Sequence, residues 1–259
     1  MKNTITHIAA FALLALFTAC DSETQDELAI ATVSTEIEST ELIPEVVHKD
    51  HYVYVTAPSG LSLREYNNLD SKKMSVMPYG TKVKVITLEE NETMSVGGIK
   101  GGMNQVEYNN KTGYAFNGYL SSFFPPEKNS SAKQYIEDLK TTHPNASYTK
   151  ITGGTASNPT ETETVLLPTS KWQEGFTFAQ RLFDLPLVFA FPSPKGNDEE
   201  NITNPKQPDY LFLSKLIVAR ADNQLQQIKY HQAGEGYQSN ITISQEEDMM
   251  KIEYVTVIE

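Results

Sequence analysis

The feature that most limits the fold of this chain is the shortness of its apolar runs after residue 51, each of which stops at a turn signal. In residues 81–86, Val83 and Val85 alternate with lysines, which is the pattern of a half-buried strand. Pro78–Gly80, Gly97–Gly98 and Asn109–Asn110 mark turns between such runs. Many short strands with frequent turns predict a mainly β protein that begins with a small β-barrel.

Three ordered motifs in residues 52–121 point to a known family. They are Gly60–Arg64 (GLSLR), Pro78–Val83 (PYGTKV), and Lys111–Tyr114 (KTGY) with Tyr119-Leu120 after it. On these motifs the segment resembles the bacterial SH3 family, although that family often has Trp where Tyr114 stands. The resemblance implies an SH3-like barrel over residues 51–127 that binds a cell-wall (peptidoglycan) peptide or an envelope protein.

Four aromatic residues of this barrel are candidate ligand-binding residues: Tyr66, Tyr79, Tyr114 and Tyr119. A tyrosine ring suits a shallow groove because it offers both apolar area and a hydroxyl group. The alternative is that these rings close the ends of a small core. We favour that alternative for Tyr114 and Tyr119, which lie in the closing strand, and leave it open for Tyr66 and Tyr79.

Residues 128–259 form a predicted α+β domain that resembles no family we can name. Ser130 or Ser131 caps a predicted helix that runs to Lys140 with one apolar stripe. Gly175–Leu185 is a second predicted helix, and Leu187–Phe191 is a predicted buried strand. A third predicted strand covers residues 165–167, and loops are expected over residues 153–163 and 193–209 because neither stretch has an apolar period.

The end of the chain is dense in predicted strands. Four runs, over residues 210–221, 225–231, 239–245 and 249–258, are separated by turn signals such as Asp222-Asn223 and Gly234–Gly236. This pattern predicts an antiparallel meander, on which the helices would pack. A single continuous all-β unit is the alternative for this half.

The first twenty residues indicate where the protein is sent. Ile8–Ala19 is a short apolar run behind Lys2, too short to span a bilayer as a helix and typical of a secretory signal. Cys20, the only cysteine of the chain, follows directly, and this arrangement resembles a bacterial lipoprotein signal. The resemblance implies cleavage after residue 19 and acylation of Cys20, with palmitate among the expected chains. The protein would then be held to a lipid bilayer of the cell envelope, on the periplasmic or the surface side of the outer membrane.

Residues 20–50 are a predicted acidic tether. Residues 21–50 contain nine Asp and Glu against one Lys, and they are rich in Ser and Thr. Such a composition buries too little apolar surface to fold, so we expect an extended spacer. The acids after Cys20 also resemble the export signal of some surface lipoproteins, and a plain linker is the alternative. The whole chain has a net charge of -12, which argues against a nucleic-acid partner.

The search for catalytic chemistry predicts no catalytic residue, no metal site and no cofactor. Residues 21–259 lack Cys, which excludes a thiol hydrolase, and the chain has no Gly-x-Ser-x-Gly elbow. Among the histidines only His48 and His51 are close in sequence, in or beside the tether, where the solvated-linker interpretation is favoured over a metal site. His231 is expected to be an ordinary sheet residue.

One carboxylate arrangement keeps an enzymatic alternative open. Glu161, Glu163 and Glu174 lie in the second domain, with Trp172 as a sugar platform or, more commonly, a core anchor. We therefore carry three hypotheses: a non-catalytic envelope lipoprotein that binds through its SH3-like domain, a cell-wall glycan hydrolase, and a structural subunit of an envelope assembly.

Overall fold

The structure is a computed structural model that describes residues 51–127 and 130–258. Residues 48–259 group into one compact unit. The predicted signal, Cys20 and the acidic tether lie outside the described residues. Within the described ranges, none of the helices has the length and apolar character needed to cross a bilayer.

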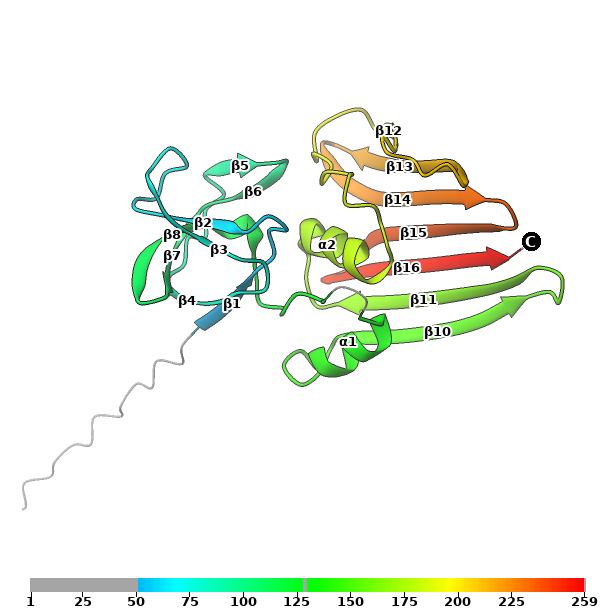
Figure 1. The fold of residues 1–259 in the computed structure, drawn as a ribbon, viewed down its shortest axis with the longest axis horizontal. Helices are drawn as coiled ribbons and strands as arrows, with labels where there is room; N and C mark the ends of the chain where they lie inside the picture. Colours follow the sequence, from blue (N-terminus) through cyan, green and yellow to red (C-terminus); the bar gives the residue numbers. More distant parts are fainter. Residues whose placement is uncertain (1–50, 128–129, 259) are drawn as a thin grey trace, which may run out of the picture. The chain divides into compact units, whose positions relative to one another are not determined.

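Strands dominate the described residues, and the strand pairs described are antiparallel, so the predicted mainly β class is confirmed (Figure 1). The first sheet has the order β3-β2-β8-β7-β4-β1-β9. Its strands are β1 His51–Val55, β2 Leu61–Arg64, β3 Lys73–Met77, β4 Lys82–Thr87, β7 Met103–Tyr108, β8 Lys111–Phe116 and β9 Leu120–Ser121, with the 3-10 helix η1 Asn117–Tyr119 before β9. The two end strands, β3 and β9, do not pair with each other in the described part of the chain, so the sheet is not a closed barrel.

The core of this first sheet follows from the alternation of its strands. Val83 and Val85 of β4 are buried, as their spacing predicts. Asn109 and Asn110 have φ of 49° and 59°, the left-handed backbone that a two-residue turn between β7 and β8 requires. A separate ribbon, β5 Met94–Val96 with β6 Ile99–Gly101, turns at Gly97-Gly98, both at positive φ.

The second sheet has the order β10-β11-β16-β15-β14-β13-β12. Its strands are β10 Ser147–Gly154, β11 Pro159–Leu167, β12 Glu199–Thr203, β13 Leu211–Ala221, β14 Gln224–Gly234, β15 Tyr237–Glu246 and β16 Met249–Ile258. Strands β13 to β16 pair consecutively, which confirms the predicted meander. Residues 123–252 contribute a core cluster distinct from that of residues 53–120.

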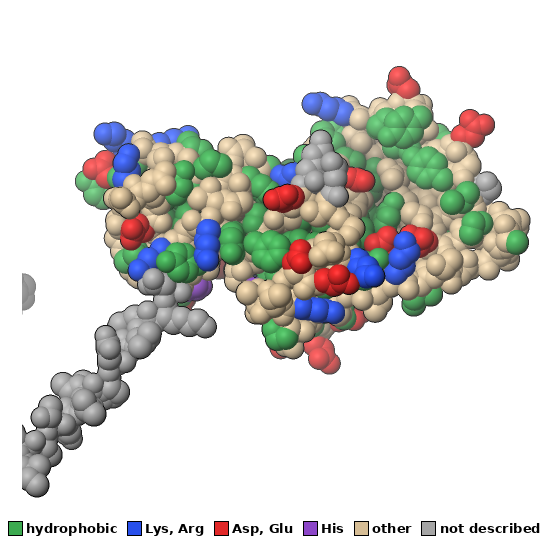
Figure 2. Space-filling model, turned by 60° about the horizontal axis from the view of Figure 1, so that its bottom comes forward, with side chains coloured by type: hydrophobic (Ala, Val, Ile, Leu, Met, Phe, Trp, Pro, Cys, Tyr) green, Lys and Arg blue, Asp and Glu red, His purple; other side chains and the backbone are tan. Residues whose placement is uncertain are grey.

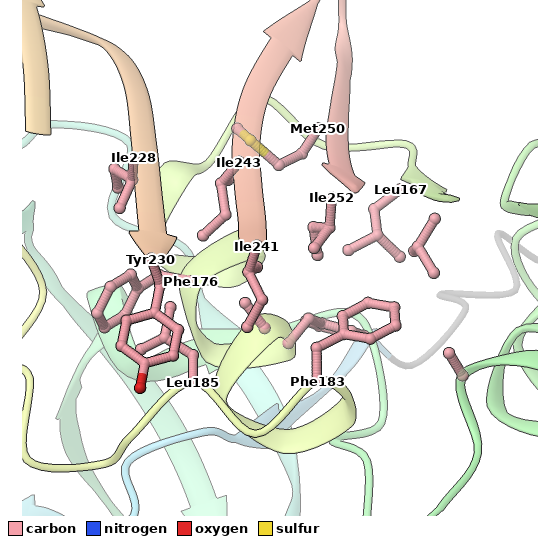
Figure 3. Close-up of a cluster of buried hydrophobic side chains, with 14 of the residues drawn as sticks. Leu167, Phe176, Phe183, Leu185, Ile228, Tyr230, Ile241, Ile243, Met250 and Ile252 are labelled. Carbon is pink, nitrogen blue, oxygen red and sulfur yellow. The ribbon is translucent and has the colours of Figure 1, made fainter. Parts of the chain in front are cut away.

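Two helices lie side by side on one face of the second sheet. In α1, Ala132–Leu139, the Ser131 hydroxyl accepts a hydrogen bond from the Gln134 N–H, so the predicted cap and helix are confirmed. The second helix, α2, Trp172–Leu182, begins three residues before the predicted start. Its apolar side chains, with Phe183 and Leu185 beyond its end, face the inward side chains of β14, β15 and β16 (Figure 3).

Three predictions for this half are wrong. Leu187–Phe191 is not a strand: the Phe189 N–H bonds to the Pro186 carbonyl in a turn, and the Gln180 amide donates to the carbonyls of Pro186 and Phe189. Residues 153–163, predicted as a loop, belong largely to the β10–β11 hairpin. The predicted loop over residues 193–209 contains β12.

Candidate ligand-binding cleft

One hollow formed by the described residues has a volume of about 820 Å³ and lies within the unit of residues 48–259. The loop after β4, the β5–β6 turn and η1 contribute to it, as do the start of α2 and the β13–β14 turn. Most of the residues that line it have polar side chains, and those of most chemical interest are Glu89, Glu90, Glu92, Asn104, Asn117, Lys100, Lys171, Trp172 and Gln173. Acids, amides, two amines and an indole therefore share one cleft.

An asparagine pair holds the acidic loop of this cleft in place. The Asn104 side chain is buried, and its amide oxygen accepts from the Glu89 N–H at 2.9 Å and from the Asn117 amide at 3.2 Å. The Asn117 amide also donates to the Glu89 carbonyl at 2.9 Å, and its oxygen accepts from the Gly102 N–H. Each bond satisfies a polar group that would otherwise lie unpaired beside the core. The pair thus fixes where the loop begins.

The acids of the loop are anionic partners in this cleft. The pKa of Glu89 is lowered, chiefly because its carboxylate accepts a hydrogen bond from the Asn91 N–H and also one from the Asn91 amide. Glu92 forms a loose ion pair with Lys100, at 3.8 Å between nitrogen and oxygen. A lowered pKa keeps Glu89 charged, which suits the binding of a cation better than proton donation.

The indole of Trp172 takes part in the fold as well as in the cleft. Trp172 is the first residue of α2 and packs partly buried against the second core cluster. Gln173 and Lys171 flank it on the cleft wall. Both interpretations of this residue, as core anchor and as ligand platform, agree with its position.

None of the four predicted tyrosines lines the cleft of about 820 Å³. The Tyr79 hydroxyl donates to the Pro126 carbonyl at 3.1 Å, and the Arg181 guanidinium lies 4.3 Å from the centre of its ring. Tyr119 meets Phe116 edge to face at 5.9 Å. Tyr114 and Tyr119 both pack against the first core cluster, which agrees with the structural interpretation favoured for them.

Tyr66 differs from the other three because its side chain is 63 % exposed. It lies in the loop between β2 and β3, where its N–H bonds to the Ser71 hydroxyl. This position leaves its ring available to a partner, and its role in binding stays a prediction.

The carboxylates behind the hydrolase alternative are engaged elsewhere. Glu161 and Glu163 of β11 both form ion pairs with Lys150 of β10, and Glu163 also accepts from the Tyr148 hydroxyl at 3.0 Å. Glu174 is buried in the first turn of α2 and accepts from the Thr169 hydroxyl at 2.6 Å. None of these three acids lines the cleft of about 820 Å³.

Two histidines of the second half have lowered pKa values. Burial lowers the pKa of His143, which meets the Phe123 ring at 4.6 Å, and burial with two nearby lysines lowers that of His231. Residues 51–127 and 130–258 contain no cluster of three or more His, Cys, Asp or Glu that could hold a metal ion.

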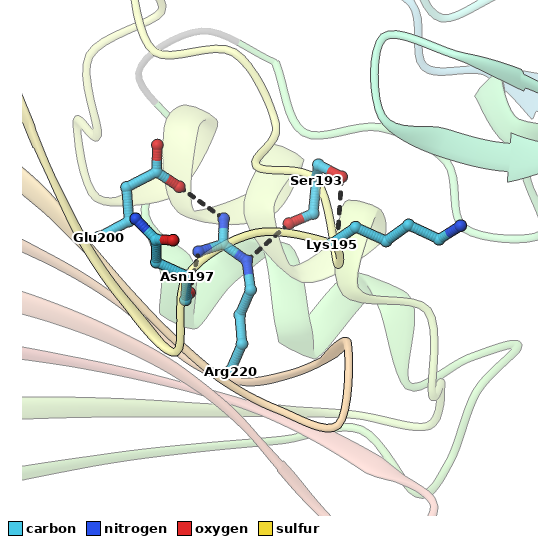
Figure 4. A network of polar contacts seen from close by, with 5 residues as sticks. All are labelled: Ser193, Lys195, Asn197, Glu200 and Arg220. Carbon is cyan, nitrogen blue, oxygen red and sulfur yellow. Dashed lines mark hydrogen bonds and ion pairs between the residues drawn. The ribbon is translucent and has the colours of Figure 1, made fainter.

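A second hollow of about 540 Å³ is built around a buried arginine that sequence reasoning missed. Arg220 ends the buried face of β13 with a side chain 2 % exposed. Its guanidinium donates to the carbonyls of Ser193 and Asn197, at 2.8 and 3.0 Å, and to the Glu200 carboxylate at 2.7 Å (Figure 4). All three contacts belong to the segment that leads into β12, so we interpret Arg220 as its structural anchor.

Comparison with known proteins adds no assignment. No protein-family model, curated protein or solved structure matches this chain. The resemblances to the bacterial SH3 family and to lipoprotein signals stay predictions that depend on the motifs quoted above.

Sequence reasoning also missed the cleft itself. Asn104 and Asn117 belong to no recognisable motif. The hydrogen bond between their side chains joins β7 to η1, a contact that the sequence alone does not predict. The one available signal is the polar stretch Glu89–Gly102, whose composition is that of an ordinary loop.

Proposed function

We propose that this chain is a non-catalytic lipoprotein of the cell envelope that binds a cell-wall peptide or a protein partner. Acylated Cys20 would hold it to the bilayer, and the acidic segment 20–50 would space the folded unit from the lipid. The observation that supports the binding role is the cleft of about 820 Å³, whose acidic wall comes from residues 89–92, within the region that we propose to be SH3-like.

The chemistry of this wall fits a peptide better than a sugar or a nucleic acid. A cell-wall peptide offers ammonium, amide and carboxylate groups. The lowered pKa of Glu89 favours its anionic form, which suits an ammonium group; the amides of the cleft suit a peptide backbone, and Lys171 suits a carboxylate. Figure 2 adds that acidic and basic side chains are interspersed on the face shown, which is not the continuous basic surface that phosphate backbones need.

The sole tryptophan of the chain provides the test. Trp172 lines the cleft, so a ligand that enters should shift its fluorescence emission. We expect soluble cell-wall stem peptides to give a saturable shift with the purified full chain. Glu89→Gln keeps the oxygen that accepts from Asn91 and removes only the charge, so it should weaken binding by about tenfold, the value of a lost charged contact.

Glu235→Gln is the matched control, because Glu235 is an exposed acid in the β14–β15 turn, away from the residues that line the cleft. It should leave the affinity unchanged. Equal weakening by both variants would show a general charge effect, and a shift without saturation would remove the cleft as the site.

Two rival functions are tested in parallel. Zymography on cell-wall material would favour the glycan hydrolase if a cleared zone appeared and was lost in Glu174→Gln. Crosslinking in intact cells followed by co-purification would favour the assembly subunit if one stoichiometric protein partner was recovered whether or not Glu89 was intact.

A further inference from the structure

The outer edge of the second sheet has an unusual strand. β10 pairs only with β11, through eight consecutive residue pairs without a register shift. Residues 149–154 are all exposed, and Ile151 is 65 % exposed. An edge strand of this kind presents a row of N–H and C=O groups that no neighbouring strand uses.

The other edges of the two seven-stranded sheets carry features that discourage pairing. β12 has five residues and begins with Glu199 and Glu200. β3 begins at Lys73, directly after Lys72, and its pairing with β2 contains a register shift. β9 has two residues. Short length, charge and irregularity are the usual means by which edges avoid other chains, and β10 has none of them beyond Lys150.

Lys150 does not protect this edge, because its charge is already matched within the same copy. Its ammonium forms ion pairs with the carboxylates of Glu161 and Glu163 on β11. The remainder of β10 is Ser, Tyr, Thr, Ile and Gly. The single lysine of the strand is thus offset by two neighbouring carboxylates, and β10 itself contains no acid on a chain that is otherwise strongly acidic.

We propose that the outer edge of β10 pairs antiparallel with β10 of a second copy of this chain, which joins the two sheets into one. Two-fold symmetry requires one residue to lie opposite itself. A centre at Lys150 would place two ammonium groups opposite each other, which is unfavourable. A centre at Ile151 places two exposed apolar side chains together and sets Lys150 opposite Thr152, and Thr149 opposite Gly153, of the second copy.

Disulfide crosslinking in the full chain tests this register. Opposite residues of an antiparallel pair have Cα atoms about 4.5–5.5 Å apart, within the range of a disulfide. Ile151→Cys should therefore form a covalent dimer under mild oxidation by oxygen with a copper–phenanthroline catalyst. All variants carry Cys20→Ser, so that the introduced thiol is the only one.

Thr149→Cys is the matched control on the same face of the same strand. In the proposed register, two copies of residue 149 are separated by four positions, or about 14 Å, which is too far for a disulfide. Thr149→Cys alone should not crosslink, whereas a mixture of Thr149→Cys and Gly153→Cys should. Equal crosslinking of Ile151→Cys and Thr149→Cys would show random collision and overturn the register.

Sedimentation tests the dimer without new cysteines. The full chain should sediment at twice the monomer mass at high concentration. Ile151→Asp places two negative charges opposite each other and should raise the dimer dissociation constant by about tenfold or more. Ile258→Asp, at a position 58 % exposed on β16, is the control and should leave dimerisation unchanged.

Circular dichroism of both Asp variants establishes that they fold. A chain that stays monomeric at every concentration, or a dimer that Ile151→Asp does not weaken, would overturn the proposal. Neither result bears on ligand entry into the cleft, because β10 contributes no residue to its lining.

Discussion

Replacing Arg220 by methionine is the most informative single change in the second sheet. The Arg220 side chain is nearly fully buried. Its guanidinium donates three short hydrogen bonds to residues before and within β12. Methionine has a similar length and fills much of the same space, so the change removes the charge and its three bonds while leaving little cavity.

The magnitude follows from what each partner does after the change. Hydrogen bonds to charged groups contribute about 1.5–3 kcal/mol each, which sets an upper limit of several kcal/mol for three. Glu200 has a side chain 43 % exposed and rehydrates, and the burial cost of the guanidinium is recovered. We therefore expect Arg220→Met to lower the free energy of unfolding by about 2–3 kcal/mol. Arg220→Lys should cost at least as much, because it keeps a buried charge and cannot reproduce three fixed bonds.

Urea unfolding of the full chain measures this directly, and limited proteolysis should cut residues 193–199 faster in both variants than in the parent chain. Lys195→Ala, an exposed change in the same segment, should alter the free energy of unfolding by less than about 0.5 kcal/mol. A cost below about 0.5 kcal/mol for Arg220→Met, or protection of the segment from proteolysis, would refute the role of Arg220 as an anchor.

Three further changes test other parts of the molecule. Gly175→Ala should lower the free energy of unfolding by about 1–2 kcal/mol, because the added Cβ would lie 2.5 Å from Met250 Cγ. This loss should exceed the gain from the better helix propensity of alanine. An unchanged midpoint in urea titrations would contradict this close approach. The lowered pKa values of His143 and His231 mean that folding disfavours their protonation. The free energy of unfolding should therefore fall as the pH drops below the ordinary histidine pKa of 6.5. In unfolding measured from pH 7.5 to 5, a double variant with His143→Gln and His231→Gln should flatten that fall. Cys20→Ser should move the protein from the membrane to the soluble fraction of cells, and a variant that still sediments with membranes would remove the proposed anchor.

The correctly predicted elements are those that bury one face, because such elements have a clear periodic pattern of apolar residues in the sequence. In α1 the apolar residues at helical spacing are the buried ones, and the Ser131 cap stands where the stripe begins. The meander of β13 to β16 alternates along long strands because only one face meets the helices. In such cases burial alone sets the pattern.

Predictions failed where burial does not follow a period. The apolar run at Leu187–Phe191 resembled a buried strand, yet Leu187 is 59 % exposed and Phe189 is buried. Its backbone is satisfied instead by the Gln180 side chain, a long-range partner that the local pattern does not contain. A run of apolar residues between two prolines therefore indicated neither the conformation of the segment nor its burial, since only Phe189 of the five residues is buried.

The candidate site was the least predictable part, because it depends on side chains that meet only after folding. Tyrosines were singled out for their chemistry, but Tyr79 is engaged by Pro126 and Arg181. The cleft is instead shaped by Asn104 and Asn117, residues whose composition signal is that of any polar loop. Motif-free amides of this kind become visible only through their hydrogen bonds.

The hairpin of β10 and β11 links the failed prediction to the proposed interface. Its strands lack an apolar period because residues 149–154 are exposed and much of β11 is only partly buried. A strand that extends beyond the core needs another source of order, and here the cross-strand ion pairs of Lys150 and the bond from Tyr148 to Glu163 contribute it. Those same ion pairs remove the charge that would keep a second copy away. The exposure of residues 149–154 thus removes the apolar period by which the strand could be predicted, and it also leaves the edge of β10 open to pairing.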